Sequence, residues 1–148
     1  MIFNEFRYIE KCLFNYPLNM AQLKILQADL TVLKASYDFQ SRSYLTNKTS
    51  STPPSSPVEK HLEKIQVCEN KIKKLECMTE GVTIFINELR ARKNFQRNRE
   101  YKKLLDLFYF GGASLAEIAK NLKMSRATIF RRRREIVGKV ASYLRMEK

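Results

Sequence analysis

The stretch from residue 114 to residue 144 reads SLAEIAKNLKMSRATIFRRRREIVGKVASYL and has the pattern of two helices joined by a tight turn. Ser114, followed three residues later by Glu117, forms a capping box that predicts a helix start. Ser125 can cap a second helix, whose apolar residues recur at helical spacing. Its inward positions are Ile129, Ile136, Val140 and Leu144. Two short helices joined in this way are typical of a helix-turn-helix, in which the second helix, the reader helix, enters the major groove of DNA.

Four consecutive arginines distinguish the predicted reader helix. Steps of about 100° per residue, counted from Ile129 at the centre of the buried face, divide this helix into an outer face and two flanks. Arg132 and Arg133 fall on the flanks, where a guanidinium group can reach a phosphate. The outer residues, which can contact base edges, are Ala127, Phe130, Arg131 and Arg134. The complete set of predicted DNA contacts is Ser125, Arg126, Ala127, Thr128, Phe130, Arg131, Arg132, Arg133 and Arg134.

The distribution of charge supports this interpretation over a simple solvated helix face or a localisation tag. Residues 90–148 contain 17 of the 28 Lys and Arg residues but 5 of the 15 Asp and Glu residues, so nearly all of the net charge of +13 lies there. A polyanion-binding domain requires positive charge to be concentrated in one segment, whereas a solvated surface does not. Five further cations can extend the phosphate contacts: Lys93, Arg97, Arg99, Lys102 and Lys103.

The N-terminal part, residues 1–39, is predicted to form a helical hairpin. Its first helix has apolar positions at helical spacing and ends before Pro17, and Asn19 can cap the next helix. The second helix carries a leucine seam at Leu23, Leu26, Leu30 and Leu33. The hairpin either packs on the rest of the chain or offers a docking surface for another protein.

Residues 40–57 read QSRSYLTNKTSSTPPSSP and are predicted to be a disordered Ser/Thr/Pro linker, because they offer few apolar side chains to bury.

Residues 58–97 have the pattern of a long amphipathic helix, with a kink or hairpin expected near Gly81. Glu69 and Glu76 interrupt a coiled-coil seam there, which favours packing within the chain. Residues 98–148 form the helix-turn-helix domain, in which Gly111 and Gly112 cap the preceding helix. The fold class predicted is all-α.

The sequence lacks the residues that several classes of function require. No apolar run is long enough to span a membrane, and no signal peptide is recognisable, so a cytoplasmic location is expected. Cys12, Cys68 and Cys77 lack CxxC spacing and, with one His61, do not form a zinc set, so they are expected to be reduced and structural. No cofactor is expected. The acidic residues after residue 90 are scattered singly, which argues against a metal-dependent enzyme.

Residues 99–136, REYKKLLDLFYFGGASLAEIAKNLKMSRATIFRRRREI, resemble the region-four type helix-turn-helix of bacterial sigma factors. The order of segments extends the resemblance to nearly the whole chain. A first helix ending in Phe14-Asn15-Tyr16-Pro17, a second helix, a polar linker, a long charged helix and a terminal reader helix resemble the RinA and ArpU type of phage transcription regulators. That resemblance implies an activator of late phage operons for packaging, morphogenesis or lysis, in the cytoplasm of the bacterial host.

Two positions depart from the sigma-type pattern. Lys123 stands where glycine is common, so we expect a left-handed backbone that is strained or reshaped. Arg132 stands where an aliphatic residue commonly packs inward, so its stem must substitute or the helix must rotate. We therefore regard Arg126, Arg131 and Arg134 as the principal candidates for DNA contacts.

The sequence thus predicts a transcription regulator that binds double-stranded DNA in a sequence-specific manner and is not an enzyme. Its expected partners, besides DNA, are RNA polymerase, a sigma factor or a second copy of the chain. The alternative is a small terminase-like subunit that recognises DNA for packaging, since such subunits also pair a helix-turn-helix with an oligomerising helical segment.

Overall fold

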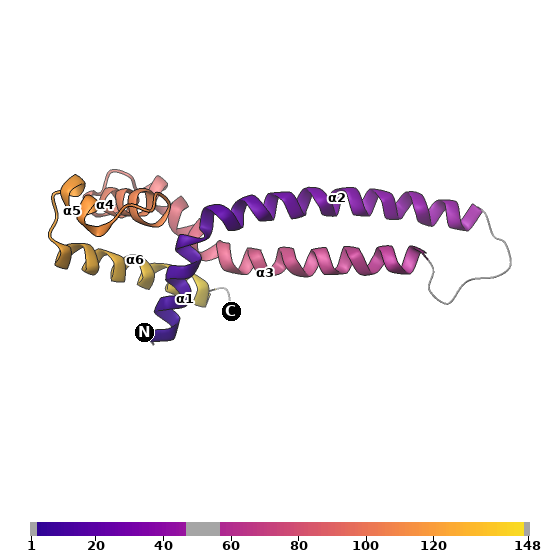
Figure 1. Ribbon diagram of the computed structural model, residues 1–148, viewed down its shortest axis with the longest axis horizontal. Coiled ribbons are helices and arrows are strands. Elements are labelled where there is room, and N and C mark those ends of the chain that lie inside the picture. The colour runs from indigo at the N-terminus through magenta and orange to yellow at the C-terminus, as the bar shows by residue number, and fades with distance from the viewer. Residues whose placement is uncertain (1–2, 47–56, 147–148) are drawn as a thin grey trace. The chain divides into compact units, whose positions relative to one another are not determined.

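The computed structural model describes residues 3–46 and 57–146, and within these ranges it contains helices and turns and no strand (Figure 1). The prediction of an all-α fold is therefore confirmed. No helix of the described ranges has an apolar stretch long enough to cross a bilayer. The elements are α1 (Phe3–Phe14), α2 (Tyr16–Thr46), α3 (Pro57–Ala91), α4 (Gln96–Leu104), the π-helical turn η1 (Leu105–Tyr109), α5 (Leu115–Leu122) and α6 (Arg126–Met146).

The chain forms two compact units, and we describe each by itself. The core unit consists of Met1–Asn19 and Cys77–Lys148, and the hairpin unit consists of Met20–Glu76. Helices α2 and α3 each begin in one unit and end in the other.

The core unit encloses one hydrophobic cluster to which α1, the last part of α3, α4, η1, α5 and α6 all contribute. The predicted inward stripe of α6 is confirmed: Ile129, Ile136 and Val140 are fully buried, and Leu144 packs against them partly exposed. Residues of α1 join the same cluster through Ile9, Cys12 and Leu13. The reader helix is therefore held by residues from the far N-terminal part of the chain.

Helix α3 continues without a break through Gly81, so a hairpin at this position, one of the two predicted possibilities, was wrong. A Cβ atom on Gly81 would lie 2.9 Å from both Cγ and Cδ2 of Leu144. The close approach of α3 to α6 thus accounts for the glycine, since a residue without a side chain lets two helices come together.

In the hairpin unit, α2 and α3 pair in antiparallel orientation. Leu23 packs with Cys68 and Ile72, while the carbonyl of Leu33 further along α2 lies 2.8 Å from Nε2 of His61, earlier in α3. The leucine seam of α2 therefore packs on α3, and the expected pairing of the first two helices is wrong. Asn15 alone separates α1 from α2, which is shorter than the connection of an αα-hairpin.

Two further predictions at the ends of α2 require correction. Asn19 does not cap a helix; it lies inside α2 and is buried, while Pro17 occupies the first turn, where proline is tolerated. Residues 40–46 belong to α2 and not to a linker, because the sequence contains no proline or glycine between Pro17 and Pro53 to end the helix. Pro57, the last residue of the predicted linker, begins α3, and residues 47–56 lie outside the described residues.

Candidate DNA-binding surface

The first helix of the pair, α5, begins as its sequence predicted. Ser114 is the N-cap, and its side-chain oxygen accepts a hydrogen bond of 3.3 Å from the backbone N–H of Glu117. Ile118 is fully buried and fixes the inner face of α5. Before it, Gly112 takes a positive φ of 69°, and a Cβ on Gly111 would lie 2.7 Å from the carbonyl oxygen of Asp106. Both glycines are therefore required for the corner between η1 and α5.

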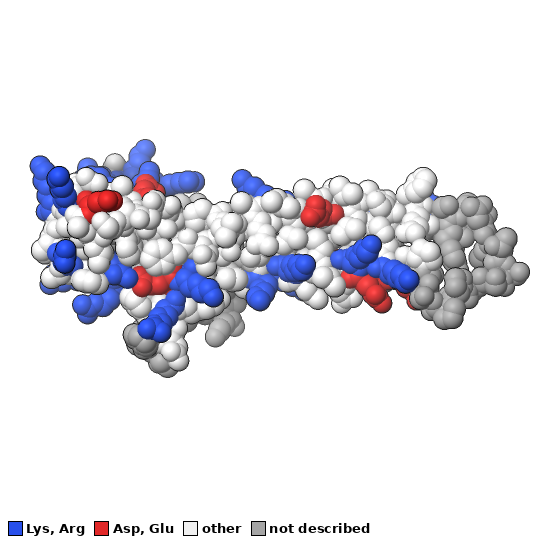
Figure 2. Space-filling view, viewed as in Figure 1, with Lys and Arg blue, Asp and Glu red and all other residues white. Residues whose placement is uncertain are grey.

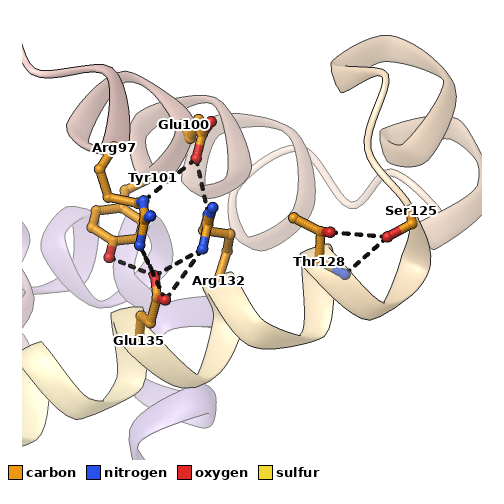
Figure 3. A network of polar contacts seen from close by, with 7 residues as sticks. All are labelled: Arg97, Glu100, Tyr101, Ser125, Thr128, Arg132 and Glu135. Carbon is orange, nitrogen blue, oxygen red and sulfur yellow. Dashed lines mark hydrogen bonds and ion pairs between the residues drawn. The ribbon is translucent and has the colours of Figure 1, made fainter.

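The turn between α5 and α6 depends on Lys123. Its backbone is left-handed, with φ 54° and ψ 42°, and its N–H donates to the carbonyl of Ala119, so the left-handed conformation expected at this position is confirmed. Ser125 then caps α6: its side-chain oxygen accepts a hydrogen bond of 3.2 Å from the N–H of Thr128. The two hydroxyl groups of Ser125 and Thr128 also lie 2.9 Å apart (Figure 3).

The outer face of α6 is basic and exposed, as predicted. Thr128 is half-buried, and its hydroxyl contacts that of Ser125 in the cap. No carboxylate of the described residues pairs with Arg131 or Arg134. Their guanidinium groups are available to a ligand, and the planar fork of arginine fits both guanine edges and phosphates. The exposed residues of this face are Arg126, Ala127, Phe130, Arg131 and Arg134.

Arg126 has a further property that suits a DNA contact. It occupies the first position of α6, which has no acidic residue in its first turn. A cation is unfavourable there, because the amino end of a helix carries partial positive charge. Arg126 therefore gains little from the helix itself, whereas a phosphate at this end would meet both the helix dipole and the guanidinium group.

Arg132 points inward, with 13% of its side chain exposed. Its Nε donates to Glu100 of α4 at 2.9 Å, and its Nη1 donates to Glu135 at 3.2 Å. Glu135 also accepts hydrogen bonds from Tyr101 at 2.7 Å and from Arg97 at 3.2 Å, so five side chains form one network between α4 and α6 (Figure 3). The predicted phosphate contact of Arg132 does not fit this arrangement, because its largely buried guanidinium group is engaged by two carboxylates of the chain. Arg97 is 52% exposed, and its phosphate contact stays a prediction.

Arg133 is also turned away from solvent, with 15% of its side chain exposed. Its Nη2 donates to both carboxylate oxygens of Glu10 in α1 at 2.9 Å, and the hydroxyl of Tyr109 donates to the same carboxylate at 2.6 Å. The guanidinium also lies over the rings of Phe108 and Phe130, 4.7 Å and 5.3 Å from their centroids. The flank position assigned to Arg133 from its spacing therefore serves to anchor α6 and not to reach a phosphate.

Burial and neighbouring groups raise the pKa values of two tyrosines in these networks and lower that of one carboxyl group. Burial, followed by the carboxylate of Glu135, raises the pKa of Tyr101 to about 12. Burial opposes ionisation of Glu135, but the hydroxyl of Tyr101 and the charges of Arg132 and Arg97 outweigh it and lower the pKa of this carboxyl group. Burial and then Glu10 raise the pKa of Tyr109. At neutral pH, both tyrosines are therefore donors and Glu135 is ionised.

The basic surface extends beyond α6. Lys and Arg side chains gather around α4, α5 and α6 on the face shown in Figure 2. Exposed cations of these helices and of the segment before α4 include Lys93, Arg99, Lys102, Lys103, Lys120 and Lys123. Such a surface can neutralise several phosphates while the face of α6 contacts bases.

Sequence reasoning missed the carboxylates and tyrosines that orient α6. One part was accessible, because Arg132 and Glu135 have the i, i+3 spacing of a helical ion pair. The contact of Glu10 with Arg133 had no such signal, because 123 residues separate the two side chains in the sequence.

The capped α5, the turn at Lys123 and the exposed basic face of α6 together define a helix-turn-helix DNA-binding domain. The family model for the ECF sigma factor matches residues 63–145, which is more than half of the chain and runs from within α3 to the last turn of α6. The chain belongs to the ECF sigma factor family, and its role is regulatory DNA binding. Neither a curated protein nor a solved structure matches it.

Proposed function

We propose that the chain is a sequence-specific transcription regulator that reads double-stranded DNA through the outer face of α6. Arg131 and Arg134 contact base edges, and Arg126 binds a phosphate at the amino end of the helix. Ala127 and Phe130 supply apolar contacts, which suit the methyl group of thymine. Surrounding lysines and arginines neutralise phosphates and fix the register of the helix on the duplex.

The observation that carries this proposal is the division of the arginine run. Arg132 and Arg133 are held by carboxylates of the chain, whereas Arg131 and Arg134 are exposed and lack such partners among the described residues. A run that served as a mere solvated face or tag would not need two of its members to be fixed in this way. Fixed neighbours reduce the freedom of α6, which favours precise contacts with base edges.

We further propose that the protein activates late phage operons, acting together with RNA polymerase or a sigma factor in the cytoplasm of the bacterial host. The support for this finer assignment is the order of segments, which resembles the RinA and ArpU type of phage regulators, together with membership of the sigma-factor family. The protein acts by binding and not by catalysis.

Selection from random duplexes at near-physiological salt, followed by sequencing, tests the proposal directly. The full-length chain should enrich one motif, and Arg131→Ala should weaken binding to that motif by about 1 to 3 kcal/mol and relax one base pair of it. Lys74→Ala is the matched control: it removes one positive charge from an exposed position of α3 in the hairpin unit and should leave the motif unchanged.

The outcomes separate the possible functions. An enriched motif upstream of a late operon, with transcription from that promoter increased by the protein, supports the activator. Absence of enrichment, with affinity that collapses as salt rises, would contradict sequence-specific regulation. Ring-sized oligomers that bind a packaging site without affecting transcription would identify the small terminase-like alternative. Equal weakening of all sequences by Arg131→Ala would make Arg131 a phosphate contact.

A further inference from the structure

Helix α2 has a second apolar face within the hairpin unit, besides the leucine seam that packs on α3. Ile25, Val32 and Phe39 are 62%, 65% and 77% exposed, and they recur at intervals of seven residues. An exposed alanine precedes each of them by four residues. We call these six residues the outer stripe: Ala21, Ile25, Ala28, Val32, Ala35 and Phe39.

The outer stripe has the geometry of a coiled-coil seam. Its residues alternate at spacings of four and three, which is the heptad pattern that keeps one line of side chains facing a partner helix. At 3.6 residues per turn, this line lies about 160° around α2 from the leucine seam that faces α3. Single exposed apolar residues are ordinary on a protein surface, but a regular heptad of them requires an explanation.

We propose that the outer stripe binds the outer stripe of a second copy of this chain in antiparallel orientation. One register then places Ile25 opposite Ala35 of the second copy, Val32 opposite Ala28, and Phe39 opposite Ala21. Every bulky side chain meets an alanine, so each layer has a similar volume and the two helices approach closely. A parallel pair would place alanine against alanine in half of its layers and leave gaps.

Along one edge, the charges beside the outer stripe fit the same arrangement. Lys24 and Asp38 are exposed on one edge of the stripe, and antiparallel pairing brings Lys24 of each copy towards Asp38 of the other. On the opposite edge, Asp29 lines a groove together with Lys60 and Lys64 of α3. The stripe itself contains no charged residue, which makes it a poor surface for DNA.

The area of the outer stripe suits a small contact between two copies. Three bulky side chains and three alanines present on the order of 500 Å² of apolar surface per copy. Two copies joined along the stripe would therefore bury at most about 1,000 Å², which is the minimum expected of a biological interface. Since α2 is already paired with α3, each copy contributes a preformed hairpin, and the association resembles a four-helix bundle.

Sedimentation equilibrium of the full-length chain tests the proposal. The natural chain should be a dimer at micromolar concentration, and the double variant Ile25→Glu, Val32→Glu should be a monomer with unchanged helical circular dichroism. Val67→Glu is the matched control, because Val67 is 53% exposed in α3 of the same unit and lies off the stripe; this variant should remain dimeric. If the natural chain is a monomer, the proposal is overturned and the stripe is left to a different protein. The proposal is also overturned if the natural chain assembles and the double variant assembles equally well.

Orientation is tested by disulfide formation between two variants of the full-length chain that differ in size by a tag. One carries Lys24→Cys and the other Asp38→Cys, both in a Cys77→Ser background, because Cys77 is exposed whereas Cys12 and Cys68 are buried. Mixed disulfides between the two variants support the antiparallel arrangement. Disulfides confined to copies of the same variant would contradict it. Neither experiment involves DNA, so the dimer can fail while the proposed DNA contacts stand.

Discussion

Arg133 of the reader helix donates hydrogen bonds from Nη2 to both carboxylate oxygens of Glu10, each at 2.9 Å, although 123 residues separate them in the sequence. The hydroxyl of Tyr109 donates to the same carboxylate. Helix α1, the π-helical turn and α6 are thereby joined by one partly buried group of charges. An N-terminal helix that lies outside the helix-turn-helix motif thus helps to orient it.

Glu10→Gln should destabilise the core unit. The substitution keeps the size of the side chain but removes the charge, so Arg133, with 15% of its side chain exposed, is left without its carboxylate. We expect the free energy of unfolding to fall by about 2 to 4 kcal/mol, since removing one member of a buried pair leaves an uncompensated charge. Urea denaturation measures this change. Glu80→Gln, at an exposed position of α3, is the control and should change stability by less than about 0.5 kcal/mol. A similar loss in both variants would mean that the pair contributes nothing specific.

Glu135 should make stability depend on pH at the acid end. Its pKa is lowered from an ordinary value of 4.5 in the folded chain, so its contribution is present above that value and is lost as pH falls through the folded pKa. We expect Glu135→Gln to reduce the free energy of unfolding by about 1 to 2 kcal/mol at pH 7. The difference between the two chains should shrink as pH falls below 4.5. Denaturant titrations over this range measure it, and a constant difference would show that ionisation of Glu135 is irrelevant.

The helix-turn-helix was predictable because its signals are local. Ser114 and Ser125 cap the two helices where the sequence placed them, and Ile129 begins the buried stripe of α6. Caps and helical periodicity depend on residues within two turns of one another, so they can be read from sequence alone. The same holds for Arg131 and Arg134, whose exposure follows from their angle to Ile129.

The roles of Arg132 and Arg133 were not predictable in this way. Periodicity places both on the flanks of α6, and a flank residue can reach outward to a phosphate or inward to a carboxylate. The choice depends on Glu100 and Glu10, which other helices bring into place. The predicted partner of the leucine seam of α2 was wrong for the same reason. Leu23 can pack on any apolar helix face, and only the tertiary structure brings it against Cys68 and Ile72 of α3.

Lys123→Gly should stabilise the chain. Lys123 has a left-handed backbone, which costs a residue with a Cβ about 1 to 2 kcal/mol, whereas glycine adopts it freely. Part of this gain is lost, because glycine has more conformational entropy in the unfolded chain. We therefore expect a net increase of about 0.5 to 1 kcal/mol in the free energy of unfolding. Thermal and urea denaturation measure the change. Lys120→Gly, inside α5, is the contrasting variant and should destabilise by about 1 kcal/mol. Destabilisation by both would show that the turn does not strain Lys123.

Gly81 and Gly138 provide a last comparison, because both lie inside helices and the sequence does not distinguish them. A Cβ on Gly138 meets no atom within 4 Å, whereas a Cβ on Gly81 would meet Leu144 at 2.9 Å. Alanine is the better helix former by about 1 kcal/mol, so Gly138→Ala should stabilise the chain by about this amount. Gly81→Ala should not, because the contact with Leu144 opposes the gain.

A double-mutant cycle isolates that contact. In a Leu144→Ala background the obstruction to a side chain at residue 81 is removed, so Gly81→Ala should now raise the free energy of unfolding by about 1 kcal/mol. The coupling between the two substitutions should be about 1 to 2 kcal/mol. Chemical denaturation of the four chains measures it. Coupling near zero would mean that α3 and α6 do not meet at Gly81, and the close approach inferred from this glycine would then be wrong.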